Sequence, residues 1–296
     1  MLCRSEPCLT LCVATCVKTL PMVQIITTAR WAAAQRSRES RRVDCLFSDP
    51  LASSLAGPEG ANALELSEQV NPRHEETAAY IAIRVRFLDD FAVRLAAEGI
   101  RQIVLLAAGM DARAFRLAWP AGTSFYELDH PELLQTKEEI LKRESAEPKC
   151  RRIILGTDLR EDWTERLKLS GFSHAEPSIW ILEGLLYYLD EEAVHRVLRQ
   201  ISQMAAKGSG LGADLVSRST LDSPWLQAAL KQMEKSGFAW KYGTDDPERL
   251  FEPYGWSAKV HQLGEEGASF GRWKSPVVPR TQREIPRTFL VAARNN

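Results

Sequence analysis

Residues 102–113 read Gln-Ile-Val-Leu-Leu-Ala-Ala-Gly-Met-Asp-Ala-Arg, an apolar run followed by small residues, one glycine and an acid. A short apolar run that ends in such a turn is typical of a buried strand in a parallel sheet. Small residues at the turn let a ligand approach the backbone, and the N-terminus of a following helix can face polar or anionic groups. With one glycine, the stretch lacks the three-glycine fingerprint of dinucleotide-binding proteins. We predict a ligand-binding strand end at Gly109.

Short apolar runs alternate with amphipathic segments on the C-terminal side of this stretch. We expect strands at residues 102–107, 124–128, 152–155, 178–182 and 211–215, and a last strand at 287–293. Helices are expected between them: Pro131–Arg143 has proline in its first turn, and Glu191–Ala206 begins after Asp190, a suitable N-cap. Strands separated by helices predict an α/β fold with a doubly wound, mostly parallel sheet.

The N-terminal side of the chain is expected to be helical, with an Arg-rich helix at Thr27–Arg42 and a long helix at about residues 76–98. The long helix carries an apolar stripe at 3.6-residue spacing, and Arg84 falls inside it, three residues after Ile81 and four before Leu88. A guanidinium group on a buried stripe is costly unless an anion meets it. That anion is either an internal carboxylate or a carboxylate of a ligand, and the sequence leaves both open.

Acids occupy the ends of four successive expected strands. They are Asp111, Asp129, Asp158 and Glu183. In open α/β sheets, ligands bind outside the carboxyl ends of the strands, where the strand order reverses. Asp129 lies 20 residues after Gly109, where a carboxylate can accept hydrogen bonds from the ribose hydroxyls of an adenosine; it could instead cap the helix at Pro131. The four acids together indicate a ligand rich in hydroxyl and N–H donors.

Four motifs carry a family resemblance. They are Leu106-Ala-Ala-Gly-Met-Asp-Ala-Arg113, Tyr126-Glu-Leu-Asp-His-Pro131, Thr157-Asp-Leu159 and Leu182-Glu-Gly-Leu-Leu-Tyr-Tyr-Leu189. Further matches lie upstream at residues 28–31, 48–51 and 83–86, so the resemblance covers roughly residues 25–215. Together these motifs resemble the leucine carboxyl methyltransferase family, and most closely its bacterial small-molecule branch of S-adenosyl-L-methionine-dependent methyltransferases.

The resemblance implies a class I methyltransferase (Rossmann-like) fold and S-adenosyl-L-methionine as the cofactor. We expect no metal, because the histidines and cysteines lack the spacing of metal ligands. The matched cofactor-binding positions are Arg84 (methionine carboxylate), Glu183 (methionine amine), Gly109 (packing against the cofactor), Asp129 (ribose), and Asp158 and Leu159 (adenine). We add Asp111, the acid of the glycine turn, to this expected set. Ala107 stands where family members often have glycine, and the cofactor-contacting lysine of the eukaryotic branch has no counterpart here.

Composition excludes several classes of protein. Lys and Arg number 38 and Asp and Glu 39, and the resulting formal net charge of −1 lacks the basic footprint of a nucleic-acid or anionic-membrane binder. No stretch reaches the roughly 18 apolar residues of a membrane span, so we expect a cytoplasmic protein. Four of the six cysteines lie before residue 17, unlike those of a disulfide scaffold, and no pattern of metal ligands completes them.

We expect one methyltransferase domain at residues 22–296, after a poorly ordered extension at residues 1–21. Within it, residues 22–98 form a helical cap, 99–215 the cofactor-binding core, and 216–296 a substrate-covering insertion with the final strands. The last part is rich in aromatic residues, namely Trp225, Phe238, Trp240, Tyr242, Phe251, Tyr254 and Trp256. They suit a substrate cover, and half of them could equally belong to the core.

The expected reaction is methylation of a carboxylate or hydroxyl oxygen of a small-molecule acceptor. The cofactor brings an activated methyl group, so the protein mainly aligns the reactants. A carboxylate acceptor needs no base, whereas a hydroxyl would need one, drawn from Tyr187, Tyr188 or His195. Tyr188 is our catalytic candidate, lining the channel through which the methyl group passes.

Three alternatives to this function stay open. The first is a protein C-terminal carboxyl methyltransferase, which would need a groove that admits a peptide tail. The second is an NAD-dependent oxidoreductase, against which the missing three-glycine fingerprint stands. The third is a module that binds the cofactor without transferring methyl. The sequence also leaves the oligomeric state open.

Overall fold

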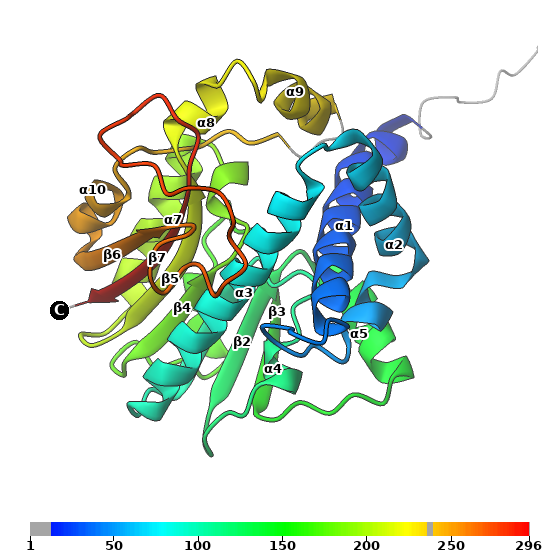
Figure 1. Ribbon diagram of the computed structural model, residues 1–296. Coiled ribbons are helices and arrows are strands. Elements are labelled where there is room, and N and C mark those ends of the chain that lie inside the picture. Colours follow the sequence, from blue (N-terminus) through cyan, green and yellow to red (C-terminus); the bar gives the residue numbers. More distant parts are fainter. Residues whose placement is uncertain (1–12, 236–238, 296) are drawn as a thin grey trace, which may run out of the picture.

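A seven-stranded sheet forms the centre of the computed structural model, which describes residues 13–235 and 239–295 (Figure 1). Its strands are β1 (Gln102–Leu106), β2 (Ser124–Asp129), β3 (Arg151–Gly156), β4 (Ser178–Leu182), β5 (Gly210–Val216), β6 (Trp256–Gln262) and β7 (Thr288–Asn295). They are arranged in the order β3-β2-β1-β4-β5-β7-β6. Strands β1 to β5 are parallel, and β7 runs antiparallel between β5 and β6. The order reverses between β1 and β4, and ligands bind outside the carboxyl ends of strands at such a switch point.

Helices cover both faces of the sheet (Figure 1). They are α1 (Val13–Ser40), α2 (Ala52–Val70), α3 (His74–Ala97), α4 (Arg113–Arg116), α5 (Pro131–Arg143), α6 (Thr164–Leu169), α7 (Glu191–Met204), α8 (Arg218–Asp222), α9 (Gln227–Lys235) and α10 (Pro247–Phe251), with 3-10 turns η1 (Leu186–Tyr188) and η2 (Glu252–Tyr254). Helices α1, α3 and α5 pack on one face, and α6, α7 and α10 on the other. Because both faces are covered, β1, β4 and β5 are buried at every residue.

Two glycines of β5 let α3 approach the sheet closely. A Cβ added at Gly210 would overlap Cδ1 of Leu95, and one added at Gly212 would lie 2.9 Å from Cδ2 of Leu88. These contacts seat the apolar stripe of α3 on β5. Arg84, one turn earlier on the same stripe, thereby lies against the carboxyl ends of β4 and β5.

All six strands expected from the sequence are confirmed, each within two residues at either end. The structure adds β6, whose alternating residues include the polar Lys259 and His261 inside a glycine- and aromatic-rich segment. It also adds α2, whose sequence contains Gly57 and Pro58 and resembles a loop. Gly57 has a φ of 58°, so the helix is kinked there. Short alternation and internal Gly-Pro are weak signals, which explains both omissions.

The N-terminal helix is longer than expected. Helix α1 begins at Val13, inside the segment 1–21 that we expected to be poorly ordered. Residues 1–12, which include most of the clustered cysteines, lie outside the described residues.

None of the helices in the described part of the chain has the length and apolar character required to cross a membrane.

Candidate functional site

The glycine turn after β1 and the end of β2 are joined by one buried carboxylate. Asp129 accepts a hydrogen bond from the backbone N–H of Gly109 through Oδ2 and one from the N–H of His130 through Oδ1, both at 2.7 Å. Burial raises the pKa of this carboxyl group. Gly109 has a φ of 47°, and a Cβ added there would lie 3.4 Å from Cβ of Ala29 in α1. The positive φ, rather than a lack of space, therefore favours glycine at this turn, and Asp129 holds the turn in place.

The residues after β3 lie next to this turn. The N–H of Thr157 donates to the backbone carbonyl of Asp129 at 2.8 Å, which ties the end of β3 to the end of β2. Asp158 is partly exposed and accepts a hydrogen bond from Nε of Arg160 at 3.0 Å; this contact lowers the pKa of its carboxyl group. Leu159 is buried in the core on the α7 face of the sheet.

Arg84 reaches from α3 to the ends of β4 and β5. Its Nε donates to Oε1 of Glu183 at 3.0 Å, and its Nη1 donates to Oδ2 of Asp214 at 3.2 Å. The hydroxyls of Tyr80 and Tyr187 each accept from Nη1 at 3.1 Å. The sequence left open whether Arg84 meets an internal carboxylate or one of a ligand. The structure shows two internal carboxylates, those of Glu183 and Asp214. Among the described residues, Nη2 of Arg84 has no hydrogen-bond partner.

A glycine borders the guanidinium group of Arg84. Gly184 has a φ of 65°, and a Cβ added there would lie 3.6 Å from Nη1 and 3.8 Å from Nη2 of Arg84. Its N–H donates to Oδ1 of Asp214 at 2.7 Å, which fixes the turn after β4 to β5. Glycine adopts this positive φ without steric strain, and because it has no side chain, the edge of the guanidinium group beside it stays uncovered.

Arg84 belongs to a chain of buried ion pairs, which we name the strand-end network. Its members are Arg36, Arg84, Arg113, Arg116, Asp49, Asp89, Asp111, Glu183 and Asp214. Neighbouring partners are 2.6 to 3.9 Å apart, and no member exposes more than 12% of its side chain. Four guanidinium groups face five carboxylates, so the network carries a formal charge of −1.

Arg113 at the start of α4 is the centre of the strand-end network. It lies 2.7 Å from Asp89, 2.6 Å from Asp111 and 2.6 Å from Glu183. Asp111 also accepts the backbone N–H of Arg113 at 2.7 Å. Burial favours the neutral form of Asp111, but Arg113 and Arg36 outweigh it and lower the pKa of Asp111 to about 2. The carboxylate of Asp111 is therefore ionised and directed to Arg113.

Aromatic side chains lie beside the network. The ring of Tyr187 contacts two other aromatic rings. Its centroid lies 4.8 Å from that of Tyr188 and 5.0 Å from that of Trp240. Burial raises the pKa of both Tyr187 and Tyr188, so both phenols are neutral near pH 7. His195 instead contacts the hydroxyl of Tyr254 through Nδ1 at 2.8 Å, outside the network.

The aromatic residues of the C-terminal part divide between core and surface. Tyr242, Phe251 and Trp256 are buried in the core on the α7 face. Trp225 exposes 80% of its surface, just before α9. Phe238 lies outside the described residues. About half of these aromatic residues thus belong to the core, as the sequence had left open.

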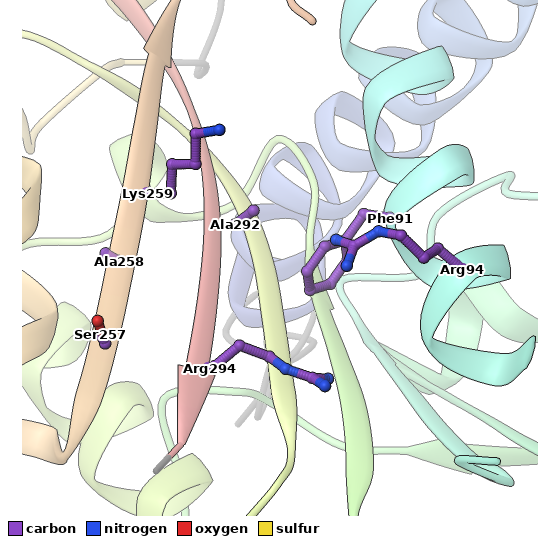
Figure 2. A pocket seen from close by; sticks show the side chains of 7 residues that line it. All are labelled: Phe91, Arg94, Ser257, Ala258, Lys259, Ala292 and Arg294. Carbon is purple, nitrogen blue, oxygen red and sulfur yellow. The ribbon is translucent and has the colours of Figure 1, made fainter. Parts of the chain in front are cut away.

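A surface groove of about 350 Å³ lies elsewhere (Figure 2). Phe91 and Arg94 of α3 form one wall, and Lys259, Ala292 and Arg294 of β6 and β7 lie opposite them. Arg294 pairs in the sheet with the first residue of β5, so the groove is at the amino end of that strand. The strand-end network lies at its carboxyl end, and the groove is not part of the candidate site.

Two residues of the site, Asp214 and Tyr80, were missed in the sequence. Asp214 is a lone acid in the apolar stretch that forms β5, and its side chain is fully buried. An acid in such a strand is costly unless it is paired, which is the signal that could have found it. Within residues 13–235 and 239–295, no group of three or more His, Cys, Asp or Glu side chains is arranged to hold a metal ion.

Comparisons with known proteins give one family. A family model described as leucine carboxyl methyltransferase matches residues 29–202. A protein of Streptomyces coelicolor named as an S-adenosyl-L-methionine-dependent methyltransferase is 40% identical over 270 residues, which cover 90% of this chain and 94% of the relative. A relative of the same name from Streptomyces avermitilis is 39% identical over 271 residues, with the same coverage of both chains.

A solved structure shares the fold. It is the crystal structure of a DUF574 family protein from Streptomyces avermitilis, with a TM-score of 0.61 at 12% sequence identity. The alignment covers 91% of this chain and 97% of the other. The expected class I methyltransferase architecture, with its mostly parallel sheet of seven strands, is confirmed.

Proposed function

Because this chain belongs to the leucine carboxyl methyltransferase family and is an S-adenosyl-L-methionine-dependent methyltransferase, we propose that it methylates a carboxylate oxygen of a small molecule. The observation that carries this choice is the state of the phenols at the site. Burial raises the pKa of Tyr80, Tyr187 and Tyr188, so none of them acts as a base near pH 7. A hydroxyl acceptor would need a base, and a carboxylate does not.

The residues at the strand ends fit the cofactor by their chemistry. We assign Asp129 to the ribose hydroxyls, since each of its oxygens accepts one N–H and has a further lone pair available. Gly109 takes the cofactor against its backbone, and Asp158 and Leu159 take the adenine. The positive φ of Gly109, which favours glycine, supports the assignment that the family resemblance gives this residue.

The methionine part of the cofactor is assigned to Arg84 and Glu183. Nη2 of Arg84 faces the Gly184 turn and would receive the carboxylate, and Glu183 would face the amine. The surplus carboxylate of the strand-end network supports this placement, because the cofactor carries one net positive charge. We assign Asp111 to holding Arg113 rather than to a direct contact with the cofactor.

When bound, the cofactor supplies a methyl group on a positively charged sulfur. The residues of this chain bind and orient it and exclude water, so proximity accounts for most of the rate enhancement. Tyr188 lies beside Tyr187 and is assigned to the wall of the channel, where its neutral phenol can donate a hydrogen bond to the acceptor. The relatives are methyltransferases by name, so we set the NAD-dependent alternative aside.

Two alanine variants test the cofactor site. Arg84→Ala and Asp129→Ala should each weaken S-adenosyl-L-methionine binding at least tenfold, about 1.4 kcal/mol or more, as measured by isothermal titration calorimetry. Glu127→Gln is the matched control, because Glu127 is fully buried on β2 but outside the strand-end network. Unchanged affinity in both alanine variants, with the control also unchanged, would contradict the site assignment.

The acceptor is tested by the bond that the labelled methyl group forms. Incubation with methyl-labelled cofactor and a metabolite extract should yield label in small products that alkali cleaves to methanol, as expected of a methyl ester. Label that resists alkali would indicate transfer to a hydroxyl. Label recovered in added peptides at their C-terminus would instead support the protein carboxyl alternative.

A further inference from the structure

Asp214 is the least expected charge in the molecule. It lies in β5 with a fully buried side chain, and it contacts three residues on two other segments, the turn after β4 and helix α3. Its Oδ1 accepts the N–H of Gly184 at 2.7 Å, and its Oδ2 accepts from Nη1 of Arg84 at 3.2 Å and from the hydroxyl of Tyr80. One carboxylate therefore fixes both the turn after β4 and the guanidinium group above it.

Tyr80 completes the support of Arg84. It precedes Arg84 by one helical turn on α3, donates its hydroxyl hydrogen to Asp214 and accepts from Nη1 of Arg84. Tyr187 accepts from the same nitrogen on the other side. With Glu183 on Nε, the guanidinium group is held on two of its three nitrogens. Its orientation is therefore set before any ligand arrives.

The charge of the strand-end network is unbalanced. Five carboxylates face four guanidinium groups, and a net charge in a buried site is costly unless a counter-charge offsets it. S-Adenosyl-L-methionine carries an ammonium, a carboxylate and a sulfonium group, a net charge of +1. Methyl transfer forms the oxygen–carbon bond and breaks the carbon–sulfur bond, whose electron pair stays on sulfur. The product S-adenosylhomocysteine is therefore neutral overall.

We propose that Asp214 is a positioning residue for Arg84, and that its charge makes the site favour the sulfonium cofactor over the neutral thioether product. Loss of the sulfonium charge in the reaction then weakens the hold on the product and aids its release. This inference rests on the proposed role of Arg84 in binding the methionine part of the cofactor. The contacts of Arg84 alone do not predict a preference between S-adenosyl-L-methionine and S-adenosylhomocysteine, and the charge of Asp214 adds one.

Asp214→Asn is the direct test, because asparagine keeps an oxygen for the N–H of Gly184 and removes the charge. Isothermal titration calorimetry should show S-adenosyl-L-methionine affinity lowered about tenfold, and S-adenosylhomocysteine affinity lowered less than about threefold, because a charge acts strongly in a buried site. Equal losses for both ligands would make Asp214 a merely structural residue and overturn the proposal. Unchanged affinity for both would overturn it as well.

Tyr80→Phe separates orientation from charge. It removes the hydroxyl that bonds Asp214 and Arg84 but leaves the formal charge of the strand-end network unchanged. Both ligands should lose affinity by the same factor, so their ratio stays at the wild-type value. A change in the ratio as large as that of Asp214→Asn would contradict the charge argument.

A third measurement uses the wild-type protein, so it tests the proposal even if Asp214→Asn does not fold. Sinefungin, an analogue with an ammonium group in place of the methylsulfonium, should bind more tightly than S-adenosylhomocysteine. Equal or weaker binding of sinefungin would overturn the proposal. Glu127→Gln, with the same burial outside the network, should leave all ratios unchanged.

Failure of this inference and failure of the proposed function give different results. If Arg84→Ala leaves the affinity for both ligands unchanged, the assignment of Arg84 is wrong. If Arg84→Ala weakens both and Asp214→Asn leaves their ratio unchanged, only the inference about Asp214 is wrong.

Discussion

Two buried ionic clusters lie on this sheet, and they differ in their charge balance. The strand-end network has five acids for four arginines. The second, which we name the β2–α5 cluster, consists of Glu127, Lys137, Glu138 and Arg152, two acids and two bases. Lys137 and Arg152 both lie 2.7 Å from Oε2 of Glu127, and Arg152 also lies 2.7 Å from Glu138. The formal charges of the β2–α5 cluster cancel, whereas the strand-end network keeps one surplus carboxylate, which we propose a positive ligand offsets.

Position along the strand separates the two clusters as well. Glu127 is in the middle of β2, where α5 covers it, whereas Asp111 of the strand-end network lies in the turn that follows the end of β1. Both carboxylates are buried, so burial alone does not mark a binding site. We propose that a surplus charge at the carboxyl ends of parallel strands is the feature that marks it. The following variants test this distinction, beginning with the largest expected effect.

Lys137→Met should cause the largest loss of stability and no loss of cofactor binding. It leaves the fully buried Glu127 with Arg152 alone, and breaking a buried pair costs about 3–5 kcal/mol in the free energy of unfolding. Urea denaturation measures this loss, and calorimetry should show cofactor affinity within about twofold of wild type. Adding Glu127→Leu should restore much of the stability, since it removes the unpaired charge. A tenfold drop in cofactor affinity would break the distinction between the clusters.

Asp111→Asn should cause a smaller loss that depends on pH. The folded pKa of about 2 lies below the unfolded value, because Arg113 and Arg36 outweigh the effect of burial. The carboxylate therefore contributes about 2 kcal/mol of stability above pH of about 4, and this contribution is lost as the pH falls through about 2. Unfolding free energies of wild type and variant, measured at several pH values, should converge in acid. A difference that stays constant with pH would refute this account.

Glu138→Gln should have the smallest effect. Glu138 is the outer member of the β2–α5 cluster, and 40% of its side chain is exposed. Exposed ion pairs contribute about 0.5 kcal/mol, and salt screens them. Thermal unfolding in low and high salt should show a slight shift that disappears at high salt. A loss as large as that of Lys137→Met would mean that the exposed end of the cluster is as important as its buried core.

The sequence predicted the central strands β1, β4 and β5 because they are buried on both faces. Their mainly apolar runs are strong signals, and the glycine turn at Gly109 marks the first strand end. The half-exposed β6 alternates between apolar and polar residues over a short length and was missed. Local pattern therefore identified the central strands and the edge strand β3, but not the alternating edge strand β6.

Local signals in the sequence placed Gly109 and Asp129 at the ends of two neighbouring strands, 20 residues apart. The structure joins them by a hydrogen bond that the sequence did not predict. The helical wheel showed that Arg84 needs an anion but could not identify it. Its partners Glu183 and Asp214 lie 99 and 130 residues away, and their pairing depends on how α3 docks on β5. Such contacts follow from tertiary packing, which no periodicity encodes.

The order of the strands affects how the nascent chain can fold. Strand β5 leaves the ribosome before β6 and β7, yet β7 is the strand that lies between the other two. Until β7 has been synthesised, the edge of β5 presents unpaired N–H and C=O groups to other chains, and such edges promote aggregation. A premature stop codon before Thr288 would leave that edge open permanently, on the strand that carries Asp214, and would make the truncated product a client for chaperones and proteases.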